Sequence, residues 1–102
     1  MNLLINSAMI PNEGTFRYEK TTQSWAIGWL QKNKFTSYIG YPQNAEYLEA
    51  ISGVSVEVSR MLCTMEVGDV ALVMKLTYRT DKPKGSPVDP SDFEFGILER
   101  LA

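Results

Sequence analysis

Residues 70–80 constrain the fold most, because this run of mainly apolar and β-branched residues predicts one long β-strand. Successive side chains of a strand point to opposite faces of its sheet. One face would carry Val70, Leu72, Met74, Leu76 and Tyr78, and the other Ala71, Val73, Lys75, Thr77 and Arg79. We therefore expect one long strand, apolar on one face and mixed on the other.

Two segments with apolar residues near helical spacing predict helices. The first begins after Thr22, which is a suitable N-cap, contains Trp25 and Trp29, and ends near residues 32–34. The second has Pro42 in its first turn and ends at Gly53, a residue typical of helix C-termini.

Strand-like segments surround these helices. They are residues 3–6, 15–19, 37–39, 54–58, 60–66 and 93–101, and residues 81–90, with three prolines and a glycine, predict a loop. This order favours an α/β protein with a mixed sheet of about five or six strands flanked by two helices. At 102 residues, the chain is expected to form a single domain, residues 1–102.

Composition narrows the choice of partners. Hydrophobic residues make up 44% and charged residues 22%, which is ordinary for a packed domain, and the net charge is −2 with both signs interspersed. A basic stripe for duplex nucleic acid is absent, whereas a small anionic ligand needs only two or three arginines. We expect no membrane partner, since no apolar run reaches about 18 residues. The single cysteine, Cys63, fits the cytoplasm and is expected to be a buried strand residue.

The chain contains no histidine. Histidine acid–base catalysis, Ser-His or Cys-His nucleophiles and most zinc sites are therefore excluded. No nucleotide-binding glycine motif occurs either, and we predict no metal and no cofactor. The acidic pairs Glu46 with Glu49 and Asp89 with Asp92 are expected to be solvated surface carboxylates.

Several polar residues stand at the ends of predicted strands, where binding residues often lie. They are Asn6, Ser7, Tyr41, Arg60 and Arg79. Each also has a plain structural interpretation: the arginines as solvated charges, Asn6 and Ser7 as a strand terminus, and Tyr41 as a packing aromatic.

The order and spacing of seven short motifs resemble the viral ring-nuclease family, the type III anti-CRISPR proteins first seen in archaeal viruses. The motifs are Asn6-Ser7, Ile39-Gly40-Tyr41, Ile51-Ser52-Gly53, Ser59-Arg60, Gly68-Asp69, Tyr78-Arg79 and Phe93-Glu94-Phe95. The resemblance implies a homodimer of mixed α/β domains that binds cyclic tetra-adenylate in a pocket across the dimer. It also implies a catalytic histidine at the position of Tyr41 and a glutamate near Asp81 and Lys82.

This chain therefore departs from the family at both catalytic positions, while Asn6, Arg60 and Arg79 match its binding positions. Tyrosine, with a reference pKa of about 10, is a poor proton donor to a leaving oxygen near neutrality. Arginines bind phosphate in bidentate fashion, and a tyrosine ring stacks on a base. The predicted ligand-binding residues are Asn6, Ser7, Tyr41, Arg60, Arg79 and Lys82, and no residue is predicted to be catalytic.

The expected function is to sequester a nucleotide-type immune second messenger without cleaving it, as a sponge from a phage or other mobile element acting in the host cytoplasm. The ligand is either a cyclic oligonucleotide or an ADP-ribose derivative. Two alternatives stay open. One is a ring nuclease that uses Tyr41 or Asp81, and the other is a protein-interaction module that uses an edge strand and an exposed Trp25 or Trp29.

Overall fold

The structure is a computed structural model and describes residues 1–6, 13–59, 63–76 and 93–102. Within them lie five strands and two helices. The strands are β1 (Asn2–Ile5), β2 (Phe16–Thr21), β3 (Thr36–Ser37), β4 (Val70–Leu76) and β5 (Phe93–Arg100), and the helices are α1 (Gln23–Lys32) and α2 (Pro42–Ser52). The predicted α/β class, with a mixed sheet and two helices, is confirmed.

The sheet places the first strand of the chain near its centre. The strand order is β2-β5-β4-β1-β3. Strands β3 and β4 both run parallel to β1, whereas β5 is antiparallel to β4 and β2 is antiparallel to β5. The sheet is therefore parallel on one side and antiparallel on the other.

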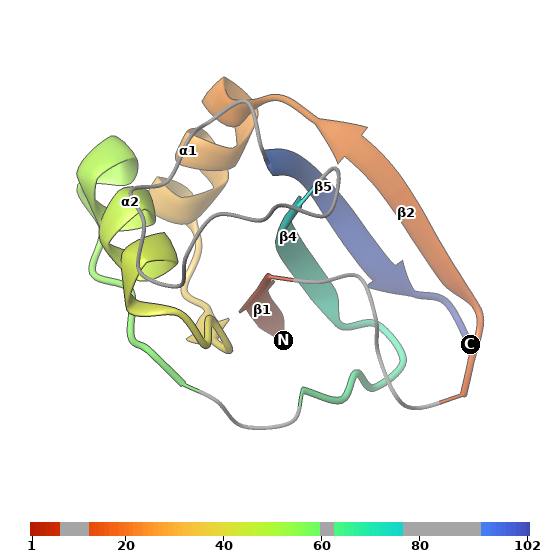
Figure 1. The fold of residues 1–102 in the computed structure, drawn as a ribbon. Coiled ribbons are helices and arrows are strands. Elements are labelled where there is room, and N and C mark those ends of the chain that lie inside the picture. Colours follow the sequence, from red (N-terminus) through yellow and green to blue (C-terminus); the bar gives the residue numbers. More distant parts are fainter. Residues whose placement is uncertain (7–12, 60–62, 77–92) are drawn as a thin grey trace.

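Both helices lie on the same side of the sheet (Figure 1). The core beneath them combines Leu4, Leu72, Met74 and Phe95 of the strands with Ala26, Trp29, Leu30, Ala45 and Leu48 of the helices. The opposite face is also apolar and buries Leu3, Ile5, Ala71, Val73 and Leu98 together with Met65. The described part of the predicted long strand thus has the expected alternation, but its second face is more deeply buried than a mixed face would be.

Local signals explain where the helices begin and end. The Thr22 hydroxyl accepts a hydrogen bond from the Trp25 backbone nitrogen and caps α1. Helix α2 has Pro42 in its first turn and ends at Gly53, whose φ of 71° lies in the left-handed region. Of the two tryptophans expected to offer an exposed ring, Trp25 is exposed but Trp29 is buried in the core. No helix in the described ranges is long and apolar enough to cross a membrane.

The predicted strands at residues 54–58 and 60–66 are wrong in their described parts. Residues 54–57 and 63–66 belong to no strand, and Val58 forms only an isolated parallel bridge with Ile39. Backbone groups of these segments bond to side chains instead: the Val56 nitrogen donates to the Glu49 carboxylate and the Glu66 nitrogen to the Asp69 carboxylate. Side chains thus satisfy some of the backbone groups that a strand would pair with its neighbour.

One polar network spans β2, β4 and β5 on the face without helices. The Tyr18 hydroxyl donates to the Glu94 carboxylate at 2.9 Å, and the ammonium groups of Lys75 and Lys20 lie 3.3 and 3.7 Å from the same carboxylate. Burial and the bond to Glu94 raise the pKa of Tyr18 to about 12, so the phenol stays protonated and donates. The bond from Tyr18 and the two lysines hold the pKa of Glu94 below its usual value, although burial opposes them.

Tyr18 reaches Glu94 by crossing directly over Gly96, where a Cβ atom would overlap its ring and hydroxyl. We predict that Gly96→Ala costs about 1–3 kcal/mol of unfolding free energy, because Tyr18 must leave its place over the strand. Urea unfolding measures the cost. In a Tyr18→Ala background the same substitution should be neutral or slightly stabilising, since alanine suits a strand better than glycine. Equal costs in the two backgrounds would show that Tyr18 does not set this requirement.

Candidate functional site

The carboxyl ends of three parallel strands meet at one end of the sheet. Leu4 pairs with Ser37 of β3, and Ile5 pairs with Val73 of β4, so the segments leaving these strands lie together. Asn6, directly after β1, is half-buried at this end. Ligands of open α/β sheets bind outside the carboxyl ends of the strands. This end is therefore the candidate site.

The amino terminus of α2 lies at the same end, because α2 follows β3 after only four residues. Its N-cap residue, Tyr41, makes no side-chain capping bond, and its first turn contains no acidic residue. Helix α1 differs, since the Thr22 hydroxyl caps it. Neither Tyr41 nor an acidic residue of the first turn therefore neutralises the positive end of the α2 dipole, and such an end favours an anionic ligand.

Tyr41 is an exposed aromatic residue at this helix terminus. It is 42% exposed, whereas Ile39, two residues earlier, is fully buried. The Ile39 carbonyl accepts a hydrogen bond from the Ser59 nitrogen at 2.8 Å, which holds the segment before Tyr41 against its neighbour. An exposed aromatic side chain on a fixed segment is suited to stacking on a base.

The structure brings two of the six predicted binding residues, Asn6 and Tyr41, to the same end of the sheet. The other four, Ser7, Arg60, Arg79 and Lys82, lie outside the described residues, as does Asp81. Their placement in the site stays a prediction.

One residue at this end was missed by sequence reasoning. Asn44, in the first turn of α2, is only 7% exposed, and it occupies the side of the helix that also carries the buried Ala45 and Leu48. The signal was present in the sequence, because Asn44 is four residues before Leu48 and so shares its face of the helix.

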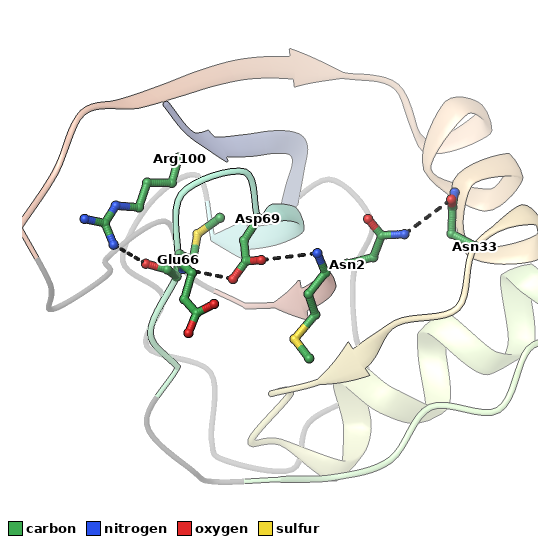
Figure 2. Close-up of polar contacts among 7 residues, drawn as sticks. Asn2, Asn33, Glu66, Asp69 and Arg100 are labelled. Atoms are coloured by element: carbon green, nitrogen blue, oxygen red, sulfur yellow. Dashed lines mark hydrogen bonds and ion pairs between the residues drawn. The ribbon is translucent and has the colours of Figure 1, made fainter. Parts of the chain in front are cut away.

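The opposite end of the parallel strands is closed by polar contacts (Figure 2). The Asp69 carboxylate lies 3.2 Å from the terminal ammonium of Met1 and accepts a hydrogen bond from the Glu66 nitrogen. The Arg100 guanidinium donates to the Met65 carbonyl at 2.6 Å, and the Asn2 amide donates to Asn33. Because these groups already bind one another, they stabilise the fold and offer little to a ligand.

Cys63 was expected to be a buried strand residue, and this is wrong, because it is half-buried and lies outside any strand. Burial, with a smaller contribution from the negative charge of Asp69, raises the pKa of its thiol. A protonated thiol is a poor nucleophile. Among the described residues no group of three or more cysteine, aspartate or glutamate side chains is placed to hold a metal ion.

The comparisons with known proteins agree with this architecture. A model of the family described as STIV B116-like matches residues 2–96. The chain belongs to the STIV B116-like family. Among solved structures, B116 of Sulfolobus turreted icosahedral virus matches with a TM-score of 0.75 over 97% of this chain and 98% of that chain, at 15% sequence identity. At that identity the match shows that the two proteins share the fold of the B116-like family. No curated protein matches the chain.

Proposed function

We propose that this B116-like protein binds a nucleotide-type second messenger at the carboxyl ends of β1, β3 and β4 and sequesters it without cleavage. The observation that carries the proposal is the placement of the Tyr41 side chain at the uncapped amino terminus of α2. A phosphate at the helix terminus and a base on the ring would be bound together.

The absence of histidine from the chain supports binding of the ligand without its cleavage. A ring nuclease that attacks with the ligand's own 2′-hydroxyl needs a proton donor for the leaving oxygen, and a positioned acid or base contributes about 10²- to 10⁴-fold. The resemblance to viral ring nucleases puts Tyr41 at that donor position, and this chain has no histidine to replace it. The relative from Sulfolobus turreted icosahedral virus supports a source in a virus or another mobile element.

A chromatographic time course with excess cyclic tetra-adenylate tests the proposal. The protein is incubated with the ligand, denatured, and the released nucleotide is measured. A sponge returns all of it as the intact ring, whereas linear products would establish the ring-nuclease alternative. Parallel incubations with ADP-ribose derivatives test the second ligand class.

We also propose that the binding unit is a homodimer, as the ring-nuclease resemblance implies, since most soluble oligomers are symmetric homo-oligomers. Light scattering at micromolar concentration with ligand present measures this, and a monomer would contradict a shared pocket.

A protein-interaction module is the second candidate, favoured by the 48% exposed Trp25 on α1. Lysate from cells with an activated defence system is passed over the immobilised protein, which is then heated. Release of a nucleotide would decide against this candidate.

We predict that Tyr41→Phe binds cyclic tetra-adenylate nearly as well as the parent, because the ring is kept. Tyr41→Ala should lose about 1–3 kcal/mol of binding free energy, the usual worth of one base stacked on an aromatic ring. Calorimetric titration measures both variants. A turnover by the parent that Tyr41→Phe abolishes would contradict the sponge and make Tyr41 a general acid.

A further inference from the structure

Asn44 is a polar side chain placed where apolar ones are expected. It lies on the sheet-facing side of α2, and the residue is more than nine-tenths buried, as are Ala45 and Leu48 beside it. An amide buried without a hydrogen bond costs free energy, so buried amides normally have partners.

Within the described part of the chain, the Asn44 side-chain amide makes no hydrogen bond, and only its backbone nitrogen is bonded, to the Tyr41 carbonyl at 3.1 Å. Yet no fully enclosed side-chain nitrogen or oxygen of these residues lacks a partner. Both observations hold only if the small accessible area of Asn44 belongs to its amide. The amide is therefore reached from solvent through a narrow opening, while the rest of the side chain is covered.

Helix geometry indicates the side to which the Asn44 side chain is directed. Side chains of an α-helix tilt toward its amino terminus, so Asn44, in the first turn, is directed to the uncapped end of α2. The first backbone N–H groups of a helix point the same way and carry the positive end of its dipole. At this terminus Pro42 has no N–H, and the backbone nitrogens of Asn44 and Ala45 already donate to the Tyr41 carbonyl. Among the described residues, this leaves the Gln43 N–H and the Asn44 NH₂ as donors for a ligand.

We propose that Asn44 donates a hydrogen bond to a phosphate oxygen of the ligand at the amino terminus of α2. The assignment rests on the proposed function for the identity of the ligand, and it adds a residue that neither the resemblance nor the family match assigns. A phosphate oxygen there would accept a hydrogen bond from the unused NH₂ of Asn44. Its negative charge would also be attracted to the positive end of the helix dipole.

Asn44→Asp is the sharpest variant, because it keeps the size of the side chain, removes the NH₂ donor and adds a negative charge. A carboxylate in the first turn favours the helix, but its burial costs free energy, so binding is compared at a temperature well below the melting temperature of each variant. Binding of cyclic tetra-adenylate should weaken by about tenfold or more, the usual loss when a hydrogen bond to a charged group is removed. A purely structural role would leave the affinity of the folded protein unchanged, whatever happens to the melting temperature.

Ser24→Asp is the matched control, since Ser24 is exposed in the first turn of α1 and the variant adds the same charge to the other helix. It should bind as the parent does. If Asn44→Asp binds as tightly as Ser24→Asp, the assignment is overturned while the proposed function stands.

A second measurement uses the unmodified protein and separates the two proposals. Inorganic phosphate is titrated into ¹⁵N-labelled protein, and the side-chain NH₂ signals of Asn44 are followed by NMR. Movement of these signals without any binding of cyclic tetra-adenylate or of the ADP-ribose derivatives would support the phosphate site and contradict the proposed function. Signals of Asn44 that stay fixed at saturating phosphate would overturn the assignment.

Discussion

Replacing Leu48 by alanine is expected to cost about 2–5 kcal/mol of unfolding free energy, as is usual when a large core side chain is truncated to alanine. Leu48 is fully buried and joins α2 to the core that contains Leu4 and Leu72. A domain of this size has only about 5–15 kcal/mol of stability, so the loss is a large part of the total.

Urea denaturation checks this expectation, and Glu46→Ala is its control, because Glu46 is exposed on the same helix and should change stability by about 0.5 kcal/mol or less. Ligand affinity should fall together with stability, since the packing of Leu48 holds the amino terminus of α2 against the sheet. A loss below about 1 kcal/mol for Leu48→Ala would show that α2 is held elsewhere.

Arg60→Ala and Arg79→Ala should each weaken binding of cyclic tetra-adenylate by about 2 kcal/mol or more, roughly 30-fold. Both arginines lie outside the described residues, so the expectation rests on their positions in the sequence and on the ring-nuclease resemblance. Each substitution removes a charge-assisted contact to phosphate and leaves the fold intact. Calorimetric titration measures the affinity, and thermal unfolding shows whether the fold is kept.

The choice of control arginine follows from the structure. Arg100, at the carboxyl end of β5, is unsuitable as a control, because its guanidinium donates to the carbonyl groups of Met65 and Ala102. Arg17 is the better control, because its side chain is 66% exposed and pairs with the exposed Glu19. If Arg17→Ala weakens binding as much as the other two variants, the phosphate-binding residues have been assigned to the wrong part of the molecule.

Local chemistry explains what could be predicted. The cap at Thr22, the proline at position 42 and the glycine at position 53 each act within one helical turn, and the sequence placed both helices from them. Alternation was a poorer guide. Residues 54–57 alternate as a strand would, but Val54 and Val56 give their backbone nitrogens to the side chains of Ser52 and Glu49. An alternating sequence indicates that successive side chains point to opposite faces. It does not indicate which groups form hydrogen bonds with the backbone.

The candidate site was predicted less completely than the fold, for a related reason. Tyr41 and Asn6 were found because they follow strands, and the parallel pairing of β1 with β3 then brings them to one end of the sheet. The 42% exposure of Tyr41 and the burial of Asn44 depend on packing between distant segments. No local pattern encodes such packing.

The central position of β1 also governs the order in which the chain folds. Its four residues pair with residues 36–37 of β3 and residues 70–73 of β4. The ribosome therefore synthesises β4, the second neighbour of β1, only after most of the chain. At ~5–20 residues per second, the ribosome needs roughly 3 to 14 seconds to proceed from β1 to β4. During that interval α1 and α2, with 10 and 11 residues, are only marginally stable as isolated helices. Leu3, Leu4 and Ile5 of β1 meanwhile lack one of their two neighbouring strands. A nascent chain that stops before residue 70 would therefore expose an apolar strand with an open edge, a species prone to aggregation.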